Sequence, residues 1–202
     1  MLEDESEELL IDEDRHEQGD IWLIPLKVLD DDARAIQLGA VAELTVEARQ
    51  REFVGDPLRM MLISLEEESR LPYVIESGGA AVGVFTLQSG AAKLAGWPDD
   101  DSVWLLRGFL IDSGSQGRGL GTLAARAAVE EARKLTARLG GGQAGVVLSV
   151  NERNPAGIAA YSKAGFVDSG RYLGGNAGPQ RTMYKAFPAD RVISIQQDPD
   201  VN

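Results

Sequence analysis

Residues 114–122, GSQGRGLGT, place four glycines around Arg118, between an apolar run, LLRGFLID (105–112), and an alanine-rich run, AARAAVEEARK (124–134). The apolar run predicts a buried strand and the alanine-rich run predicts a helix. Glycines in such a loop let backbone N–H groups face open space, because no Cβ blocks a close approach. A helix that begins near Gly119 adds unpaired N–H groups and the positive end of its dipole, which favour a bound phosphate. The stretch therefore predicts an anion-binding loop, with a plain strand-to-helix turn as the alternative.

Two well-known phosphate-binding loops do not fit these residues. The P-loop requires a lysine followed by serine or threonine after its last glycine, whereas Thr122 follows Gly121 directly. The dinucleotide fingerprint G-x-G-x-x-G has no register within 114–122. An anion bound here would therefore be held by a loop of another class.

The chain on both sides of this loop mixes predicted strands and helices. The predicted strands cover 21–28, 72–77, 80–88, 102–112 and 144–151, with two more around 166–173 and 180–187; the predicted helices cover 31–44, 57–69, 119–138 and 155–164. Gly78 and Gly79 indicate a hairpin between the second and third strands. No internal repeat or linker interrupts the pattern, so we expect residues 21–187 to form a single α/β (α+β) domain.

The formal charge of the 202-residue chain, −12, is concentrated at its beginning. Residues 1–20 hold ten Asp or Glu against one Arg, a net charge of −9, so about −3 remains on the other 182 residues. So acidic a block without aromatic residues is typical of a disordered extension, and we expect 1–20 and 188–202 to be tails outside the fold. The rest of the chain has no basic stripe, which argues against nucleic acid as a partner.

The chain has no cysteine and one histidine, His16, which lies in the acidic extension. This composition excludes a His/Cys metal site, a Ser-His-Asp triad, a cysteine nucleophile and disulfides, and we expect no metal. The N-terminus lacks a basic and apolar leader, and no run approaches 18 apolar residues. We therefore expect a cytoplasmic protein that does not contact membranes.

Two stretches together carry a family resemblance. Residues 116–121, QGRGLG, resemble the Q/R-x-x-G-x-G/A signature of the GNAT superfamily of N-acetyltransferases, and NERNPAGIAAYSKAGF (151–166) is similar to the family stretch that carries two asparagines and ends Y-x-K-x-G-F. The resemblance covers about 21–187 and is strongest over 102–166. It implies a mixed, mostly antiparallel sheet of about six or seven strands, helices on both faces and a V-shaped splay between the two central strands. It also implies that acetyl-CoA donates an acetyl group to an amine.

The resemblance implies that main-chain N–H groups of the glycine loop hold the pyrophosphate of acetyl-CoA, and that pantetheine lies between the two central strands like a short strand. The implied cofactor-binding residues are Leu110, Ile111, Gln116, Gly117, Arg118, Gly119, Leu120, Gly121, Thr122, Asn151, Asn154, Ala156 and Lys163. Asn151 has a plain strand end as its alternative. Asn154, directly before Pro155, is also well placed as a helix N-cap.

Tyr161 is the catalytic residue that the resemblance implies, as the general acid for the departing CoA thiolate. Its alternative is a core aromatic, because it follows Ile158 by three residues on a predicted helix. Without a cysteine, direct transfer in a ternary complex is the expected route. Asp112 and Glu152 are the carboxylates nearest the motifs, and the sequence favours neither as the general base.

The acceptor half of the site gives weaker signals. Residues 50–62, QREFVGDPLRMML, loosely resemble the F-V-x-x-N stretch of bacterial polyamine and diamine acetyltransferases, although Pro57 and its neighbours replace the asparagine. Acidic residues at 52, 66–68 and 99–101 are candidates for a polycation site, with solvated faces as the alternative. The aromatic residues Tyr73, Trp97 and Trp104 either wall an alkyl chain or pack in the core.

Three functions stay open at this level. The first is an N-acetyltransferase for a small, polyamine-like amine, and the second is an N-acetyltransferase for an amino acid, an antibiotic or a protein amine. The third is a module that binds acyl-CoA without turnover. A homodimer is an open alternative to a monomer.

Overall fold

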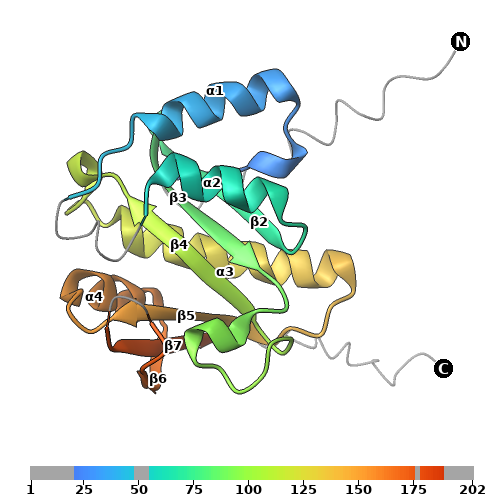
Figure 1. Cartoon of the computed structure of the whole chain (residues 1–202), viewed down its shortest axis with the longest axis vertical. Helices are drawn as coiled ribbons and strands as arrows, with labels where there is room; N and C mark the ends of the chain where they lie inside the picture. Colours follow the sequence, from blue (N-terminus) through green and yellow to red (C-terminus); the bar gives the residue numbers. More distant parts are fainter. Residues whose placement is uncertain (1–20, 48–54, 176–177, 189–202) are drawn as a thin grey trace, which may run out of the picture.

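The computed structural model describes residues 21–47, 55–175 and 178–188. Within them, seven strands form one sheet in the order β1-β2-β3-β4-β5-β7-β6 (Figure 1). The strands are β1 (Trp22–Pro25), β2 (Arg70–Ser77), β3 (Ala80–Gln88), β4 (Trp104–Ile111), β5 (Gly145–Asn151), β6 (Val167–Tyr172) and β7 (Gln180–Ala186). The helices are α1 (Asp31–Ala42), α2 (Pro57–Glu66), α3 (Leu120–Leu139) and α4 (Pro155–Ala164). This mixed and mostly antiparallel sheet confirms the predicted fold class.

Local sequence explains where these elements begin and end. The predicted β2–β3 hairpin is present, and Gly78 and Gly79 form its two-residue turn with φ of +60° and +80°, which glycine adopts readily. Asp30 caps α1 by accepting from the backbone N–H of Ala33. The strand predicted over 21–28 is shorter than expected: it ends at Pro25, which has no N–H for the ladder, and a 3₁₀ turn follows over Leu26–Val28.

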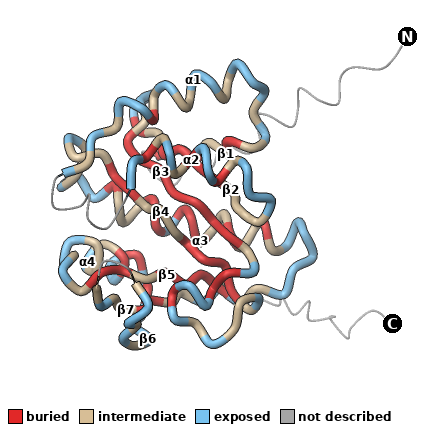
Figure 2. Tube along the Cα trace, in the orientation of Figure 1, coloured by how far each residue is buried: buried red, intermediate tan, exposed pale blue. Residues whose placement is uncertain are grey.

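Two helical layers cover the two faces of the sheet. Alternate residues of β3 point to opposite faces, and Phe85 and Leu87 pack with residues of α3 and α4 in one buried cluster. Val84 packs on the other face, in a second cluster that includes Val41 of α1 and Met61 of α2. The buried residues follow the central strands and α3, whereas much of α1 is exposed (Figure 2).

The two central strands separate after a short stretch of pairing. β4 and β5 run parallel and pair at Trp104↔Val146 and Leu105↔Val147. β4 continues to Ile111 and β5 to Asn151 without further pairing between them. The predicted V-shaped splay is therefore present, and it opens the sheet at the ends of these two strands. The predicted extensions, 1–20 and 188–202, lie outside the described residues except for Pro188.

Candidate active site

The glycine loop joins β4 to α3 and leaves its backbone open. Gly117 and Gly119 have φ of +76° and +82°, and a Cβ at either position would meet no atom within 4 Å. Gly119 is the N-cap of α3, so no side chain accepts from the first turn of that helix. No capping side chain therefore competes for the N–H groups at the start of this 20-residue helix, as an anion site requires.

Side chains on both sides hold this loop in place. Gln116 Nε2 donates to the backbone oxygen of Ile111 at 3.0 Å. Asp112 accepts from the Thr45 N–H at 2.8 Å, the Thr45 hydroxyl at 2.9 Å and the Gly114 N–H at 2.9 Å. Burial alone would raise the pKa of Asp112, but these hydrogen bonds outweigh it and hold that pKa below its ordinary value. Asp112 therefore acts as a fixed anchor rather than a free proton acceptor.

A cavity of about 200 Å³, which we call the loop cavity, lies against the glycine loop. Ten of the thirteen predicted cofactor-binding residues line it: Leu110, Ile111, Gln116, Gly117, Gly119, Leu120, Gly121, Thr122, Asn154 and Ala156. Asn151 instead lines a second cavity. Arg118 and Lys163 are exposed and line neither cavity.

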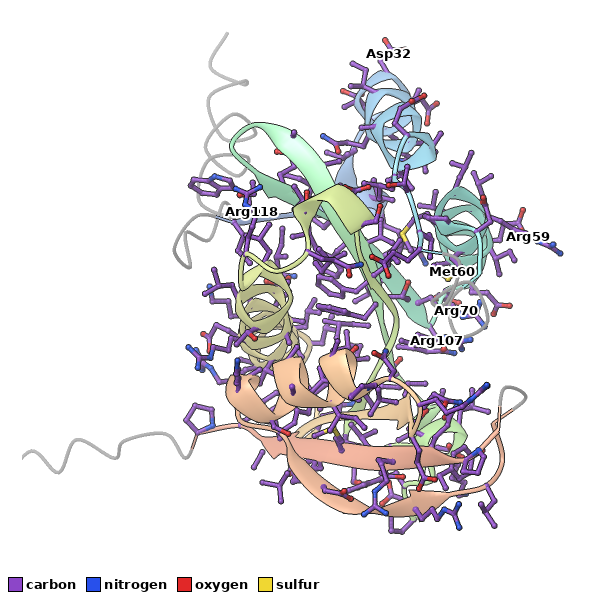
Figure 3. All side chains as sticks on the ribbon, turned by 90° about the vertical axis from the view of Figure 1, so that its left-hand side faces the viewer. Asp32, Arg59, Met60, Arg70, Arg107 and Arg118 are labelled. Atoms are coloured by element: carbon purple, nitrogen blue, oxygen red, sulfur yellow. The ribbon has the colours of Figure 1, made fainter. Side chains whose placement is uncertain are left out.

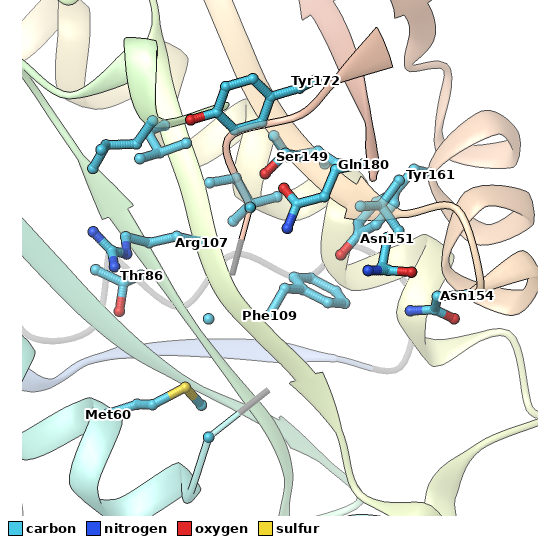
Figure 4. Close-up of a pocket in the computed structure, with 18 of the residues that line it drawn as sticks. Met60, Thr86, Arg107, Phe109, Ser149, Asn151, Asn154, Tyr161, Tyr172 and Gln180 are labelled. Atoms are coloured by element: carbon cyan, nitrogen blue, oxygen red, sulfur yellow. The ribbon is translucent and has the colours of Figure 1, made fainter. Parts of the chain in front are cut away.

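The second cavity, of about 610 Å³, lies between the separated parts of β4 and β5, and we call it the central cavity. Residues of α2 and β3 close one side of it, and Tyr172, Gly174, Gly175 and Gln180 contribute to another. Phe109, Asn154 and Tyr161 line both cavities, so the two spaces meet at these three side chains (Figure 4).

A β-bulge shapes the wall of β4 at this junction. Val84 pairs with Leu110 and Thr86 with Arg107, so Gly108 and Phe109 together face the single residue Phe85. Gly108 adopts φ of +58°, which favours glycine. The bulge takes two residues out of the regular ladder and turns Phe109 toward both cavities.

Tyr161 of α4 is both a packed core residue and a cavity residue. Its side chain is 8% exposed, and its ring meets Phe109 and Phe166 edge to face with centroids 5.6 and 5.9 Å apart. Burial raises the pKa of the Tyr161 phenol well above its ordinary value, so the hydroxyl carries its proton at neutral pH. Within the described parts of the chain this hydroxyl makes no hydrogen bond. It is therefore a proton donor without an internal partner.

The two asparagines of the second motif have separate structural roles. Asn154 Oδ1 accepts from the Gly157 N–H at 2.9 Å, which confirms the predicted N-cap of α4. Asn151 ends β5, is buried, and accepts from the Arg153 N–H at 2.9 Å. Since Asn154 also lines both cavities, a capping role does not remove it from the site.

The carboxylates considered for the acceptor and the general base lie elsewhere. Glu152 pairs with Arg171 at 2.9 Å, and Asp100 pairs with Lys93 at 3.3 Å. Asp99 accepts from Ser102, and residues 66–68 are exposed outside the central cavity. Glu52 lies outside the described residues. The charged side chains among the described residues that line the central cavity are two arginines, at positions 70 and 107.

The aromatic residues proposed to wall an alkyl chain also pack away from the central cavity. Tyr73 donates to Glu131, Trp97 to Ser102 and Trp104 to Thr136. None of the three lines the central cavity. All three residues therefore pack in the core or at its edge, and core packing was the alternative given for them.

Several residues of the central cavity escaped the sequence analysis, among them Arg70, Arg107, Gly108, Tyr172 and Gln180. For two of them, the sequence itself carried a signal. Gly108 inside a strong strand pattern is typical of a bulge, and Arg107 is a charge inside an apolar run. The contribution of Tyr172 and Gln180 depends on the insertion of β7 between β5 and β6, which local sequence does not reveal.

In the described residues, no group of three or more Asp, Glu, His or Cys could hold a metal ion. The helices within the same residues are too short or too polar to cross a membrane.

Comparison with known proteins identifies the family of the chain. The Acetyltransferase (GNAT) family model matches residues 27–166, so the chain belongs to the GNAT acetyltransferase family. No sequence among the curated proteins matches the chain.

Solved acetyltransferases share the fold. An aminoglycoside acetyltransferase AAC(6')-Ib, solved with coenzyme A and kanamycin, is 20% identical, with 82% of this chain and 94% of that chain covered and a TM-score of 0.62. Spermidine N-acetyltransferase from Vibrio cholerae, solved with CoA and spermine, is 14% identical, with 83% and 95% covered and a TM-score of 0.55. At these identities the likeness concerns the fold.

Proposed function

We propose that the protein is an acetyl-CoA-dependent N-acetyltransferase that moves the acetyl group directly to the amine of a small acceptor. The observation that carries this proposal is the meeting of the two cavities at Phe109, Asn154 and Tyr161. One cavity has the chemistry of a phosphate site, and the other is large enough for a second small molecule. A donor in the first and an amine in the second would meet beside the Tyr161 hydroxyl.

The loop cavity fits the co-substrate. Gly117 and Gly119 offer backbone N–H groups without side-chain obstruction, and the N-terminus of α3 adds its dipole, which together suit a pyrophosphate. The unpaired inner edge of β4 offers backbone groups to the pantetheine amides. Acetyl-CoA would supply an acetyl thioester. Arg118 and Lys163, which were also predicted to bind the co-substrate, are exposed outside this cavity.

Tyr161 is the proposed general acid. Its phenol carries its proton at neutral pH, as tyrosine ordinarily does, and it has no competing hydrogen-bond acceptor among the described residues. Proton donation to the departing thiolate needs both properties. The hydroxyl would complete the transfer by neutralising the sulfur as the new amide bond forms.

The attacking amine must lose one proton, and no carboxylate among the described residues lines the central cavity. Asp112 is held by hydrogen bonds and Glu152 by an ion pair. We infer that the proton leaves to water in this cavity. The related solved structures hold kanamycin or spermine, both polycations, whereas this cavity presents two arginines.

The experiment that tests the proposed function measures release of the CoA thiol from acetyl-CoA across a panel of amines. The panel includes spermidine, kanamycin, amino acids and a lysine-containing peptide, with product mass confirming acetylation. Amine-dependent thiol release supports the proposal. Tight CoA binding with no acetylated product from any amine would indicate a binding module and overturn it.

A further inference from the structure

Arg70, Gln88 and Arg107 lie side by side on three adjacent strands, β2, β3 and β4. Arg107 Nη1 donates to Gln88 Oε1 at 2.7 Å, and Arg70 Nε donates to the same oxygen at 3.3 Å. Gln88 in turn donates to Ser69 at 3.3 Å. One buried amide therefore holds two guanidinium groups together at the edge of the central cavity.

The two cations have no ionic partner in the described parts of the chain. Neither arginine forms an ion pair there, and the exposed Glu67 is the acidic residue whose charge acts on Arg107. Burial, followed by the charge of Arg70, lowers the pKa of Arg107, whereas Glu67 acts more weakly in the opposite direction. Like charges brought together and partly desolvated are unfavourable unless an anion compensates them.

The surroundings place this pair at one end of a binding space. Figure 4 shows Arg107 and Thr86 across the central cavity from Tyr161, Asn151 and Asn154, with Phe109 between them. Figure 3 shows Arg70 and Arg107 on the same side of the molecule as Met60, whereas Arg118 lies on the far side. Apolar side chains also line this cavity: Met60, Ile63, Leu105, Leu106 and Phe109.

We propose that the acceptor is an amine that carries an anionic group, a carboxylate or a phosphate ester, and that Arg107 and Arg70 bind this group. The proposal rests on the proposed acetyltransferase function and names the substrate class of the same site. A guanidinium donates two parallel hydrogen bonds to either anion, and it remains charged when partly buried. With its anion at the arginines, the acceptor would extend its amine along the apolar wall toward Tyr161.

The same pair disfavours a polycationic acceptor. An ammonium group near two arginines meets like charges in a partly desolvated space, with no carboxylate among the described lining residues to offset them. To bind spermidine or kanamycin, the cavity would need negative charges that offset this repulsion, and its described lining residues carry none. The two arginines would therefore attract an acceptor that carries an anionic group and repel one that carries several ammonium groups.

The test compares amines that differ only in the anionic group, using the full-length protein and acetyl-CoA. The pairs are L-leucine with L-leucinamide, 6-aminohexanoate with 6-aminohexanamide, and O-phosphoethanolamine with ethanolamine; spermidine and kanamycin are added as polycations. We expect kcat/KM to be roughly 10- to 100-fold higher for the anionic member of at least one pair, because hydrogen bonds to charged groups contribute on that scale. The pair that responds distinguishes carboxylate from phosphate.

Variants connect the preference to the arginines. Arg107→Gln and Arg70→Gln should lower kcat/KM for the preferred anionic amine by roughly tenfold or more and leave its neutral analogue within about threefold. Arg107→Lys should recover part of the loss, because lysine keeps the charge without the planar fork. Arg59→Gln is the matched control, because Arg59 is exposed on α2 and points away from the cavity. Equal turnover of anionic and neutral members in every pair, or preference for a polycation, overturns the proposal.

Calorimetry with the CoA-loaded protein separates this proposal from the proposed function. If the anionic amine binds in an Arg107-dependent manner but no amide is formed, the anion site is supported and the transferase assignment is wrong. If acetyl transfer occurs and Arg107→Gln leaves the preference among the amine pairs unchanged, the transferase stands and the anion site is wrong.

Discussion

Phe109 and Tyr161 meet edge to face, with ring centroids 5.6 Å apart and planes inclined by 69°, at the point where the loop cavity joins the central cavity. One ring comes from the bulge in β4 and the other from the buried side of α4. Edge-to-face packing fixes the orientation of the phenol ring without using its hydroxyl. The Tyr161 hydroxyl is therefore positioned by packing and available for chemistry.

Tyr161→Phe keeps this ring contact and removes the hydroxyl. If the hydroxyl donates its proton to the departing thiolate, kcat should fall by roughly 10² or more, with acetyl-CoA affinity nearly unchanged. Steady-state kinetics on an acceptor for which chemistry limits the rate, together with CoA calorimetry, measure both. The free energy of unfolding should change by less than about 1 kcal/mol, because the hydroxyl has no internal partner.

Tyr184→Phe is the control for that measurement. Its hydroxyl donates to the Ala144 backbone oxygen at 3.2 Å and lines neither cavity, so kcat should stay at the wild-type value. If Tyr161→Phe retains more than about half of the wild-type kcat, Tyr161 is a packing residue and not the acid.

Gly119→Asp tests the glycine loop. The substitution strains a residue at φ of +82° and places a carboxylate where the pyrophosphate is proposed to bind, so CoA affinity should fall by at least about tenfold. Gly140→Asp is matched to it, because Gly140 lies at the other end of α3 with φ of +63°, and a Cβ there would also meet no atom within 4 Å. Calorimetry should show weak CoA binding only for the first variant; equal affinities in two folded variants would contradict the loop assignment.

Asn154→Asp separates capping from cofactor binding. Aspartate caps a helix as well as asparagine does, so the melting temperature should stay within a few degrees of wild type. The variant loses the Nδ2 donor and adds a negative charge beside the loop cavity, so CoA affinity should fall by roughly tenfold. Asn154→Ala should lower both the melting temperature and the affinity. Unchanged CoA affinity in Asn154→Asp would restrict Asn154 to the cap.

Asp112→Asn should lower the free energy of unfolding at neutral pH by about 1 kcal/mol. The reason is that Asp112 caps the turn before the glycine loop and accepts a hydrogen bond from Thr45. The folded state lowers the pKa of Asp112, so its carboxylate stabilises the fold above the unfolded value of about 4, and this stabilisation is lost as the pH falls through the folded pKa. Urea unfolding should show the largest difference from wild type at pH 7 and a shrinking one below about pH 4. Glu66→Gln, which removes a carboxylate from an exposed position on α2, is the control for the change in net charge. A difference that stays constant with pH would exclude a charge-dependent role for Asp112.

Several elements of the fold were readable from local patterns because they carry their own start or stop signal. Asp30, Asn154 and the pair Gly78–Gly79 act on their immediate neighbours, and their effects do not depend on the rest of the chain. The ends of β1 and β2 were less predictable. Arg70 belongs to β2, two residues before the predicted strand, because pairing with Gln88 extends the ladder beyond the apolar run.

The same difference between local and long-range contacts decided which part of the site could be predicted. Most of the loop cavity comes from one continuous stretch, 109–122, together with the start of α4, so motif spacing located it. The central cavity collects residues from separate parts of the chain: α2, α4 and the strands β2 to β7. Arg107 and Arg70 meet only through the register of three strands, and sequence spacing carries no information on that register.

The separation of β4 from β5 gives the sheet two inner edges in addition to its outer ones. After Leu105↔Val147, backbone groups on the facing sides of these strands belong to no shared ladder, so their amide protons should exchange with solvent faster than those of β2 or β3. A strand-like ligand in this gap would act as a removable eighth strand. Its arrival would join a four-stranded and a three-stranded half into one continuous sheet, so that occupancy of the gap and the rigidity of the whole domain would rise together.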